Sequence, residues 1–418
     1  MKFEDFMCSA NEDIFGKAKS VSDFLENNTD TGNESLGVQL LSASSTEPTM
    51  KEKNGDIHQS IMMGSNSYLN LTTHPQVMEG ARKAMEKYGF GMGAVSLYGG
   101  ITDLHRELEE RIAAFYRADD AILFPNGYGT NIGVISAMCH EGDIIINDSA
   151  NHASIFDGCK LSGAETKIYL HGNMSHLERI LSKIPDSQKG RLIITDGVFS
   201  MHGDLAKLDK IYELSQKYNA RLMIDDAHGL GIVGPTGRGT AEKFNLQGKI
   251  DLNVGMLSKS PGAIGGYCAS RKDVIQYLRL YARTYFFSTS LPAAIVGGLI
   301  EIFKLMEQDQ AGRQQLWDNI NYAKALLLQN KFNIGDSESG IIPIIIGDEE
   351  KLIKFHNELR SRGLYTNIVT YPAVRRKECR IRLCIMKELT KQQIDNAVNI
   401  IVESANVTLD PIMASPPN

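Results

Sequence analysis

The sequence predicts an α/β protein, with a large unit built on a mostly parallel seven-stranded sheet and a smaller α+β unit after it. Three observations support this fold class. From about residue 60 to 300, seven short apolar runs alternate with segments of helical periodicity. From about residue 300 onward, helical stretches dominate and the apolar runs are fewer. The 418 residues, 42% hydrophobic and 22% charged, suffice for about two to three domains with sizeable cores.

The domain boundaries follow from these patterns. We expect an N-terminal arm, partly loop, over residues 1–60, a large domain over 61–300 and a small C-terminal domain over 301–418. Within the arm, residues 1–26 can form a short amphipathic helix. Residues 27–57 are rich in Asn, Ser, Thr, Gly and charge, which is typical of a loop or a loosely packed arm.

The seven apolar runs predict the strands of the large domain. They are AILF (121–124), DIIIND (143–148), KIYL (167–170), RLIITDG (191–197), RLMIDDAH (221–228), DLNVGML (251–257) and GGYCAS (265–270). Strands that alternate with helices form a mostly parallel sheet covered on both faces. In such sheets the ligand crevice lies beyond the carboxyl ends of the strands, so the informative residues should follow these runs.

Helical periodicity and further apolar runs complete the predicted elements. In the large domain, helices are expected at Leu104–Arg117 and Leu205–Tyr218. The elements expected in the C-terminal domain are a long helical stretch (Ala293–Leu328), a strand IIPIII (341–346), a helix (Glu349–Arg362), the runs LYTNIV (364–369) and RIRLCI (380–385), and a final helix (Thr390–Ala405).

Composition excludes several classes of protein. A net charge of -6 and a pI of about 6.0 disfavour a general nucleic-acid binder, which carries a basic surface. No apolar run approaches the roughly 18 residues of a membrane helix, and the acidic start lacks the pattern of a signal peptide. The six cysteines form no C-x-x-C pair. We therefore expect reduced thiols in a cytoplasmic protein, without a disulfide framework or a metal site.

One glycine pattern resembles a dinucleotide fingerprint without its context. Gly229, Gly231 and Gly234 spell G-x-G-x-x-G after the strand RLMIDDAH. The fingerprint needs a helix to begin at this turn, but Pro235-Thr-Gly-Arg-Gly follows, which is typical of a loop. We interpret the pattern as a loop and rank a nicotinamide-dependent dehydrogenase last.

Two strand ends predict pyridoxal phosphate (PLP) chemistry. Asp225 and His228 follow one strand, and Lys259 lies between two serines about thirty residues later. An amine removed from water has a lowered pKa and can form a Schiff base. A buried carboxylate requires a positive partner, and a pyridinium nitrogen supplies one in PLP enzymes. Either residue alone is also consistent with a structural ion pair or a solvated loop lysine.

Two weaker motifs fit the same site. Gly127 and Tyr128 follow the strand AILF and precede a helix, so their backbone N–H groups can bind a phosphate. His152 follows the strand DIIIND. A single histidine there is more often structural, but it can stack on a planar cofactor that lies in the crevice.

Together these residues resemble the α-oxoamine synthase family of PLP enzymes, which includes glycine acetyltransferase, aminooxononanoate synthase, aminolaevulinate synthase and serine palmitoyltransferase. The likeness runs from Ser65 to the final helix. It covers SNSYLNLTTHP (65–75), GGITDLHRELEERIAAFY (99–116), NGYGTN (126–131), NHASIFDGCKLSGAE (151–165), TDGVFSMHGD (195–204), DDAHGLGIVGPTGRG (225–239), LSKS (257–260), FSTSLP (287–292) and RIRL (380–383). Three runs, HASIFDGCKL (152–161), SKSPGAIGGYCAS (258–270) and LYTNIVTYPA (364–373), resemble serine palmitoyltransferase in particular. The resemblance implies the PLP-dependent transferase fold of type I.

The resemblance implies catalytic and ring-binding roles. Lys259 would form the Schiff base and shuttle protons, and Asp225 would pair with the pyridine nitrogen. His228 would bond the ring phenolate oxygen, with Ser200 in support. His152 would stack on the ring.

The resemblance also implies how the phosphate is bound. The backbone N–H groups of Gly127 and Tyr128 would hold it together with Ser258. Ser288 and Thr289 would reach it from the neighbouring subunit, so a homodimer with shared active sites is implied.

The implied substrate residues are Asn66, which would line the substrate side, and an arginine that binds the amino-acid carboxylate. Arg380 and Arg382 lie on one face of a strand, so spacing alone leaves both open, and the resemblance favours Arg382. Ser96 would line the acyl-donor side.

Three positions depart from the family pattern. Ser96 stands where arginine is frequent, Met256 where threonine is usual three residues before the lysine, and Leu389 where a histidine is common. Met256 removes a phosphate contact. A changed pocket near Ser96 would suit a different thioester, including one carried by a protein.

The implied reaction is the decarboxylative condensation of serine, glycine or alanine with an acyl thioester of coenzyme A or acyl carrier protein. The products are an α-amino ketone and carbon dioxide. Two alternatives stay open: a non-catalytic partner subunit of such a synthase, and transamination or aldol cleavage on the same fold.

Overall fold

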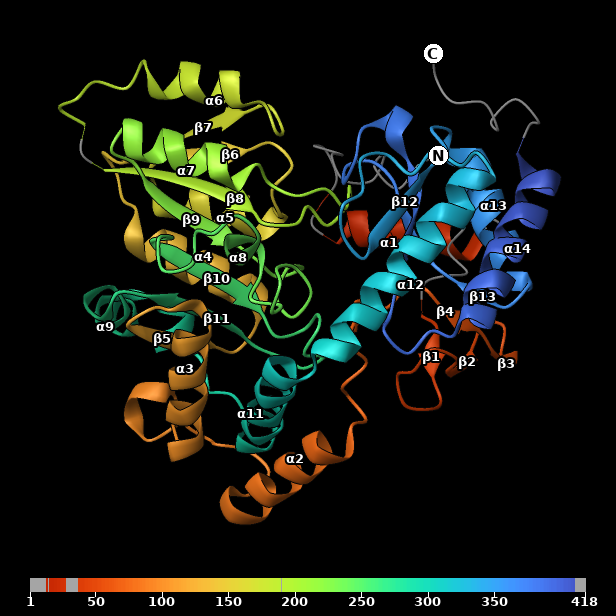
Figure 1. The fold of residues 1–418 in the computed structure, drawn as a ribbon, viewed down its shortest axis with the longest axis horizontal. Coiled ribbons are helices and arrows are strands. Elements are labelled where there is room, and N and C mark those ends of the chain that lie inside the picture. Colours follow the sequence, from red (N-terminus) through yellow and green to blue (C-terminus); the bar gives the residue numbers. More distant parts are fainter. Residues whose placement is uncertain (1–12, 14, 28–36, 189, 410–418) are drawn as a thin grey trace.

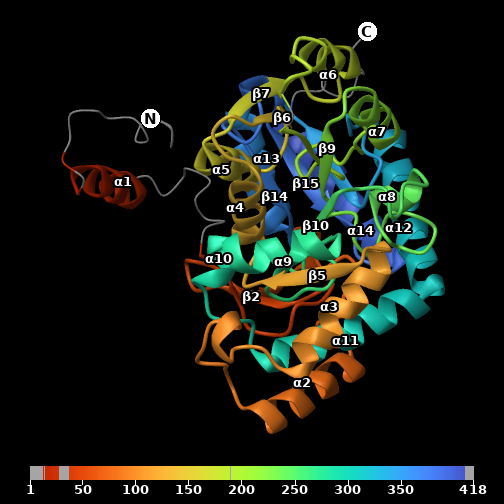
Figure 2. The same ribbon diagram turned by 90° about the vertical axis from the view of Figure 1, so that its left-hand side faces the viewer.

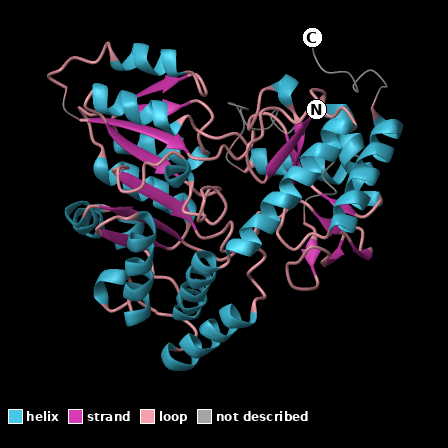
Figure 3. Ribbon diagram, viewed as in Figure 1, coloured by secondary structure: helices cyan, strands magenta, loops and turns pink. Residues whose placement is uncertain are grey.

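The computed structural model describes residues 13, 15–27, 37–188 and 190–409. Figure 1 shows a large sheet-containing unit and a smaller C-terminal unit, with the long helix α12 (Gln310–Gln329) running from one towards the other. Figure 3 shows that helices flank the strands in both units. The predicted α/β class is confirmed, and the fold is that of type I PLP-dependent transferases.

The large sheet has the order β5-β11-β10-β9-β8-β6-β7, and each strand matches one predicted run. The strands are β5 (Asp120–Phe124), β6 (Ile144–Asp148), β7 (Glu165–Tyr169), β8 (Arg191–Asp196), β9 (Arg221–Asp225), β10 (Leu252–Met256) and β11 (Gly266–Ser270). β11 runs antiparallel to both of its neighbours, while the other pairings are parallel. The sheet is therefore mostly parallel, as predicted.

Alternating side chains give this sheet two buried faces. Ile145 packs with α4, α5 and α9, whereas Ile144 and Ile146 pack with α6 and α7 on the other face. Near β5, the second face is covered by α3 and α11. The helices of the large unit are α2 (Pro75–Tyr88), η3 (Ser96–Tyr98), α3 (Asp103–Tyr116), α4 (Gly127–Met138), α5 (Ala153–Ser162), α6 (Met174–Leu181), α7 (Leu208–Lys217), α8 (Thr240–Lys243), α9 (Lys272–Tyr281), α10 (Arg283–Phe286) and α11 (Ala293–Gln308).

The C-terminal unit has a three-stranded sheet of order β12-β15-β14, packed with helices. Its elements are β12 (Ile341–Ile345), α13 (Glu349–Ser361), β13 (Leu364–Tyr365), β14 (Asn367–Val369), η4 (Arg376–Glu378), β15 (Arg380–Cys384) and α14 (Lys391–Thr408). β15 pairs antiparallel with both β12 and β14.

The single helical stretch predicted over Ala293–Leu328 is wrong in one respect, because it is two helices. Asp309 separates α11 from α12, and its side chain accepts a hydrogen bond from the backbone N–H of Gly312 at 2.7 Å. An aspartate in this position caps a new helix. Apolar periodicity continues on both sides of the break and therefore conceals it.

The segment before residue 63 is also more ordered than its composition predicts. It contains β1 (Gln39–Leu40), β2 (Thr49–Lys51), β3 (Ile57–Gln59) and β4 (Ile61–Met62). Of these, β1, β2 and the first residue of β3 fall within residues 27–57, where a loop was expected. β4 pairs in parallel with β13 of the C-terminal unit, so these residues gain strand partners from sequence about 300 positions away.

The amphipathic helix predicted within residues 1–26 is found as α1 (Gly16–Asn27). Figure 2 shows it apart from the body of the molecule. Residues 1–12 and 28–36, and with them Cys8 and part of the predicted loop, lie outside the described residues. The other five cysteines are free thiols. Among the described helices, none is both long and apolar enough to span a membrane.

The glycine-rich sequence after β9 is a loop, as predicted. Its turns enclose the carboxylate of Asp226, which accepts hydrogen bonds from the backbone N–H (2.7 Å) and hydroxyl (2.6 Å) of Thr240. A Cβ added to Gly229 or Gly239 would lie 2.0 Å or less from a carboxylate oxygen of Asp226. Glycine at these positions therefore leaves room for a structural carboxylate.

Candidate active site

The carboxyl ends of the parallel strands open into one cavity of about 220 Å³. Ten of the predicted site residues line it. They are Asn66, Gly127, Tyr128, His152, Ser200, Asp225, His228, Ser258, Lys259 and Arg382. These residues come from loops that follow five strands of the large sheet, from the segment before α2, and from β15. The sheet topology thus assembles in space what the chain distributes over more than 300 residues.

Asp225 is 4% exposed at the end of β9. One of its oxygens accepts from the Asn131 side-chain amide at 2.7 Å, and the other from the Ala227 backbone N–H at 3.0 Å. Burial raises the pKa of this carboxyl group, while the hydrogen bonds from Asn131 and Ala227 and the positive charge of Lys259 oppose that rise. Among the described residues, no cationic side chain is hydrogen-bonded to it, so a buried carboxylate here fits a cationic ring nitrogen.

His228 is hydrogen-bonded to a tyrosine that sequence reasoning missed. The Tyr68 hydroxyl lies 2.9 Å from His228 Nδ1, and both side chains are buried. Burial raises the pKa of Tyr68, so the hydroxyl keeps its proton, and burial lowers the pKa of His228, so the ring is neutral. Tyr68 therefore donates to Nδ1 and leaves the proton on Nε2, which can donate to a ring oxygen.

Lys259 is half-buried beside these groups. Burial lowers the pKa of its amine, and the positive charge of Arg382 lowers it further, while the charge of Asp225 acts against this. A lysine with a lowered pKa is neutral more often at physiological pH, as a nucleophile or a base must be.

One part of the cavity wall is the N-terminus of α4. Asn126 caps the helix by accepting from the Gly129 backbone N–H at 2.7 Å. A Cβ added to Gly127 would lie 2.2 Å from Met256 Sδ, so glycine lets the first turn approach β10. Helix N-termini of this kind bind phosphate through their N–H groups. Met256 also lines the cavity and supplies no hydrogen-bond donor there.

Arg382, on β15, also lines the cavity. It donates to Asn66 Oδ1 at 3.0 Å, to the Ser200 carbonyl at 2.5 Å and to Cys384 Sγ at 3.0 Å. Arg380, two residues earlier, instead donates to the Met201 carbonyl at 3.2 Å and does not line the cavity. The structure thus separates two arginines that spacing alone left equivalent.

Three of the predicted residues do not line this cavity. Ser96 is buried in η3, and Ser288 and Thr289 precede α11. The two segments lie against each other, because Val95 pairs with Thr289 and the Ser290 backbone N–H donates to the Ala94 carbonyl at 3.3 Å. Leu389 packs in the core of the C-terminal unit, 1% exposed.

A histidine and carboxylate cluster lies near the ends of β6 and β8. His171 Nδ1 is 3.0 Å from Asp148 Oδ1, and its Nε2 is 2.9 Å from Asp204 Oδ2. His202 lies beside it, with the ring centroids 5.2 Å apart and the rings tilted by 31°. Burial alone would lower the pKa of His171, but the hydrogen bonds and charges of the two carboxylates outweigh this effect and raise the pKa to about 10. Because both ring nitrogens are occupied, we interpret this cluster as an ion network.

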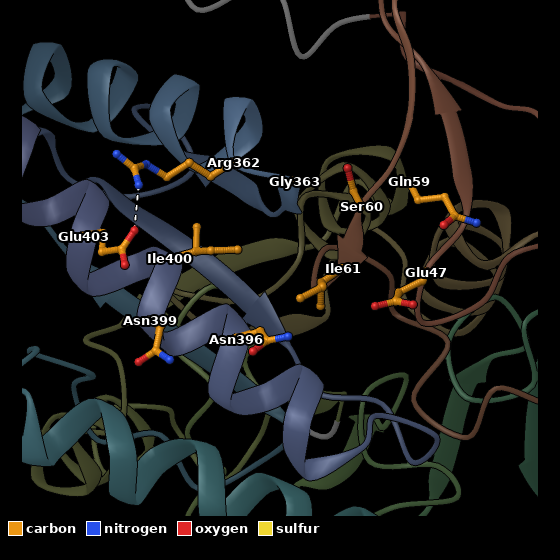
Figure 4. Close-up of a pocket in the computed structure, with 10 residues that line it drawn as sticks. All are labelled: Glu47, Gln59, Ser60, Ile61, Arg362, Gly363, Asn396, Asn399, Ile400 and Glu403. Atoms are coloured by element: carbon orange, nitrogen blue, oxygen red, sulfur yellow. Dashed lines mark hydrogen bonds and ion pairs between the residues drawn. The ribbon is translucent and has the colours of Figure 1, made fainter.

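A larger cavity of about 420 Å³ lies on the C-terminal unit, between α14 and the segment around β3 and β4 (Figure 4). An ion pair between Arg362 and Glu403, 2.7 Å long, crosses its wall. Among the residues that the structure describes, no histidine, lysine or cysteine lines this cavity. The residues that line it therefore differ in chemistry from those of the cavity that contains Lys259.

Comparisons with known proteins agree with this geometry. Residues 58–401 match the profile of the family described as Aminotransferase class I and II. The chain belongs to this family. Within it, the chain is 43% identical to an 8-amino-7-oxononanoate synthase of Thermoanaerobacter pseudethanolicus, over 81% of this chain and 86% of that protein.

Two further family members show a similar relationship. The chain is 38% identical to a 4-hydroxy-2,2'-bipyrrole-5-methanol synthase of a Serratia species, over 98% of this chain, and it spans 63% of the length of that relative. A serine palmitoyltransferase structure from Sphingomonas wittichii matches with a TM-score of 0.90 and 29% identity, covering 95% of this chain and 99% of that one.

These relatives identify the chain as a PLP-dependent acyltransferase of the α-oxoamine synthase type, which condenses an amino acid with an acyl thioester. The cavity fits this cofactor, because it joins a half-buried lysine, a buried carboxylate without a cationic partner and a helix N-terminus shaped by Gly127. Sequence reasoning missed Tyr68, Asn131 and Ser154, whose roles depend on packing between distant elements.

Proposed function

We propose that this enzyme condenses a small amino acid (glycine, alanine or serine) with an acyl thioester of coenzyme A or acyl carrier protein, giving an α-amino ketone and carbon dioxide. The observation that carries the proposal is the arrangement of one cavity. Arg382 and Asn66, which are hydrogen-bonded to each other, the N-terminus of α4 and Lys259 all line this cavity. The likeness to serine palmitoyltransferases favours serine.

The residues divide the chemistry between them. When bound, PLP supplies an electron sink for the α-carbon of the amino acid. Lys259 would hold the cofactor and move the proton at the substrate α-carbon, for which its lowered pKa is suited. Asp225 would face the ring nitrogen, and His228 the ring oxygen with Ser200 in support. His152 would stack on the ring.

The remaining contacts would hold the two ends of the site. Arg382 and Asn66 would orient the amino-acid carboxylate, as a guanidinium suits a carboxylate. Gly127, Tyr128 and Ser258 would hold the phosphate.

We further propose a homodimer in which Ser288 and Thr289 of the partner subunit reach the phosphate. In support, these residues lie outside the cavity of their own chain and against the segment that holds Ser96. Ser96 would then contribute to the acyl-donor side. We also propose that the domain boundaries lie near residues 60 and 300.

Two alternatives make different predictions. A non-catalytic partner subunit would not need Lys259, Asp225, His152 and His228, all of which face the cavity. Transamination or aldol cleavage would consume an amino acid without any thioester.

The proposal can be tested by the visible absorption spectrum of the purified protein, titrated with glycine, alanine and serine. We expect a yellow band that borohydride removes and that one amino acid shifts, because Lys259 binds the cofactor covalently. A protein that stays colourless with added PLP would contradict the proposed site and favour the partner-subunit alternative.

A further inference from the structure

Asn131 is a polar side chain in the core of the large unit, one turn into α4, and it is fully buried. Its Nδ2 donates to Asp225 Oδ2 at 2.7 Å and to Ser154 Oγ at 2.9 Å. Its Oδ1 is buried and has no hydrogen-bond partner among the described residues. An unpaired buried acceptor is costly, and a leucine of similar size would avoid this cost. The reason for an asparagine therefore lies in its two donated bonds.

The first bond fixes the carboxylate of Asp225. A carboxylate can only accept, so it determines which end of the Asn131 amide faces it. Because the Ala227 backbone N–H binds the other oxygen at 3.0 Å, the carboxylate has one donor on each oxygen and a fixed plane. Asn131 is also the strongest of the influences that oppose the burial-induced rise in the Asp225 pKa.

The second bond extends to His152 through Ser154. The Ser154 hydroxyl accepts from Asn131, which leaves its own hydrogen free to donate to His152 Nδ1, 2.7 Å away. The Ser154 backbone N–H also points to Nδ1, at 3.3 Å. His152 Nδ1 is therefore an acceptor, and its ring is held at the start of α5 with the proton on Nε2.

We propose that Asn131 is a positioning residue that fixes the two side chains facing the cofactor ring, Asp225 directly and His152 through Ser154. Because α4 also carries Gly127 at the phosphate end, this one helix sets the spacing between the ring and phosphate contacts. The proposal rests on PLP being the cofactor and is independent of the substrates proposed above.

The charged groups around Asp225 make this bond important. Lys259 and His152 lie close to it, and so do the carboxyl groups of Asp196 and Asp226. Two more acids beside a buried carboxylate favour its protonation. A donor that keeps Asp225 ionised therefore supports the pairing with a cationic ring nitrogen.

The test is the equilibrium affinity of the apoprotein for PLP, measured by fluorescence titration, together with the pH midpoint of the visible band of the bound cofactor. Asn131→Asp keeps the size but places an acceptor against Asp225. We expect PLP binding to weaken roughly tenfold or more, with a shifted midpoint. Asn131→Leu removes both donors and should weaken binding in the same way. If Asn131→Asp does not fold, the PLP affinity of Asn131→Leu tests the proposal by itself.

Two further variants separate positioning from general packing. Ser154→Ala cuts only the branch to His152, so we expect a smaller loss of PLP affinity, about threefold, and an unshifted midpoint. Asn253→Leu replaces another buried asparagine, on β10 and outside the cavity, and should bind PLP as the unmodified protein does. Affinity within twofold for both Asn131 variants, or an equal loss in Asn253→Leu, would overturn the proposal.

Discussion

Single residues at the strand ends determine the electrostatics of the active site. Lys259, Asp225 and His228 are identifiable in the sequence because each stands at the end of a buried strand or within three residues after it. Tyr68 and Asn131, which orient them, are not, because one lies before α2 and the other inside α4. Nothing local marks either residue as a hydrogen-bond partner. Their function depends on which elements pack together, and that information is absent from any short window of sequence.

The ion network around His171 predicts a pH dependence of stability. The pKa of His171 is raised to about 10 in the folded state, against about 6.5 when unfolded. Its contribution is therefore fully present below about pH 6.5 and is lost as the pH rises through about 10.

We expect the free energy of unfolding to fall by on the order of 2 kcal/mol over this range, measured by guanidinium denaturation at several pH values. His171→Gln should be less stable at pH 6 and show a flatter dependence. If the free energy of unfolding of His171→Gln declines with pH as it does in the unmodified protein, other groups cause the decline.

At the scale of elements, apolar patterning predicts the strands better than the helix ends. All seven strands of the large sheet match predicted runs, because buried parallel strands are continuous apolar segments. The break between α11 and α12 was missed, since helical periodicity continues across Asp309. The capping spacing between Asp309 and Gly312 is the signal that could have revealed it.

The cap at Asp309 predicts a measurable loss. Asp309→Ala removes the bond to the Gly312 backbone N–H and the contact with the Lys387 amine at 3.2 Å. We expect a loss of about 1–2 kcal/mol in the free energy of unfolding, measured by denaturant titration. Asp318→Ala, on the exposed side of α12 where it bonds Gln314, should change stability by less than about 0.5 kcal/mol. Equal losses in the two variants would show that the Asp309 cap does not stabilise the protein.

At the scale of the whole molecule, sequence segments about 300 residues apart complete one unit. β4 pairs with β13, and the Glu52 carboxylate accepts from the Arg360 guanidinium of α13. Composition predicted a loop here, because it reflects local preference and not the strand partner that the fold provides. The N-terminal segment therefore stabilises the C-terminal unit, whose strand β15 carries Arg382 to the active site.

This docking predicts an effect of Glu52. Glu52→Gln weakens a largely buried ion pair with Arg360, in which the side chains are 14% and 7% exposed. We expect a loss of roughly 1–3 kcal/mol in the free energy of unfolding, measured by thermal and denaturant unfolding. Glu47→Gln, at an exposed position of the same segment, is the matched control and should lie within about 0.5 kcal/mol of the unmodified protein. A neutral Glu52→Gln would show that the strand pairing alone secures this segment.

The proposed reaction can be tested by measuring the release of carbon dioxide from a carboxyl-labelled amino acid, with and without an acyl thioester. We expect release that depends on the thioester and that falls on the order of 10³-fold or more in Lys259→Ala. Carbon dioxide released without a thioester, or undiminished turnover in Lys259→Ala, would contradict it.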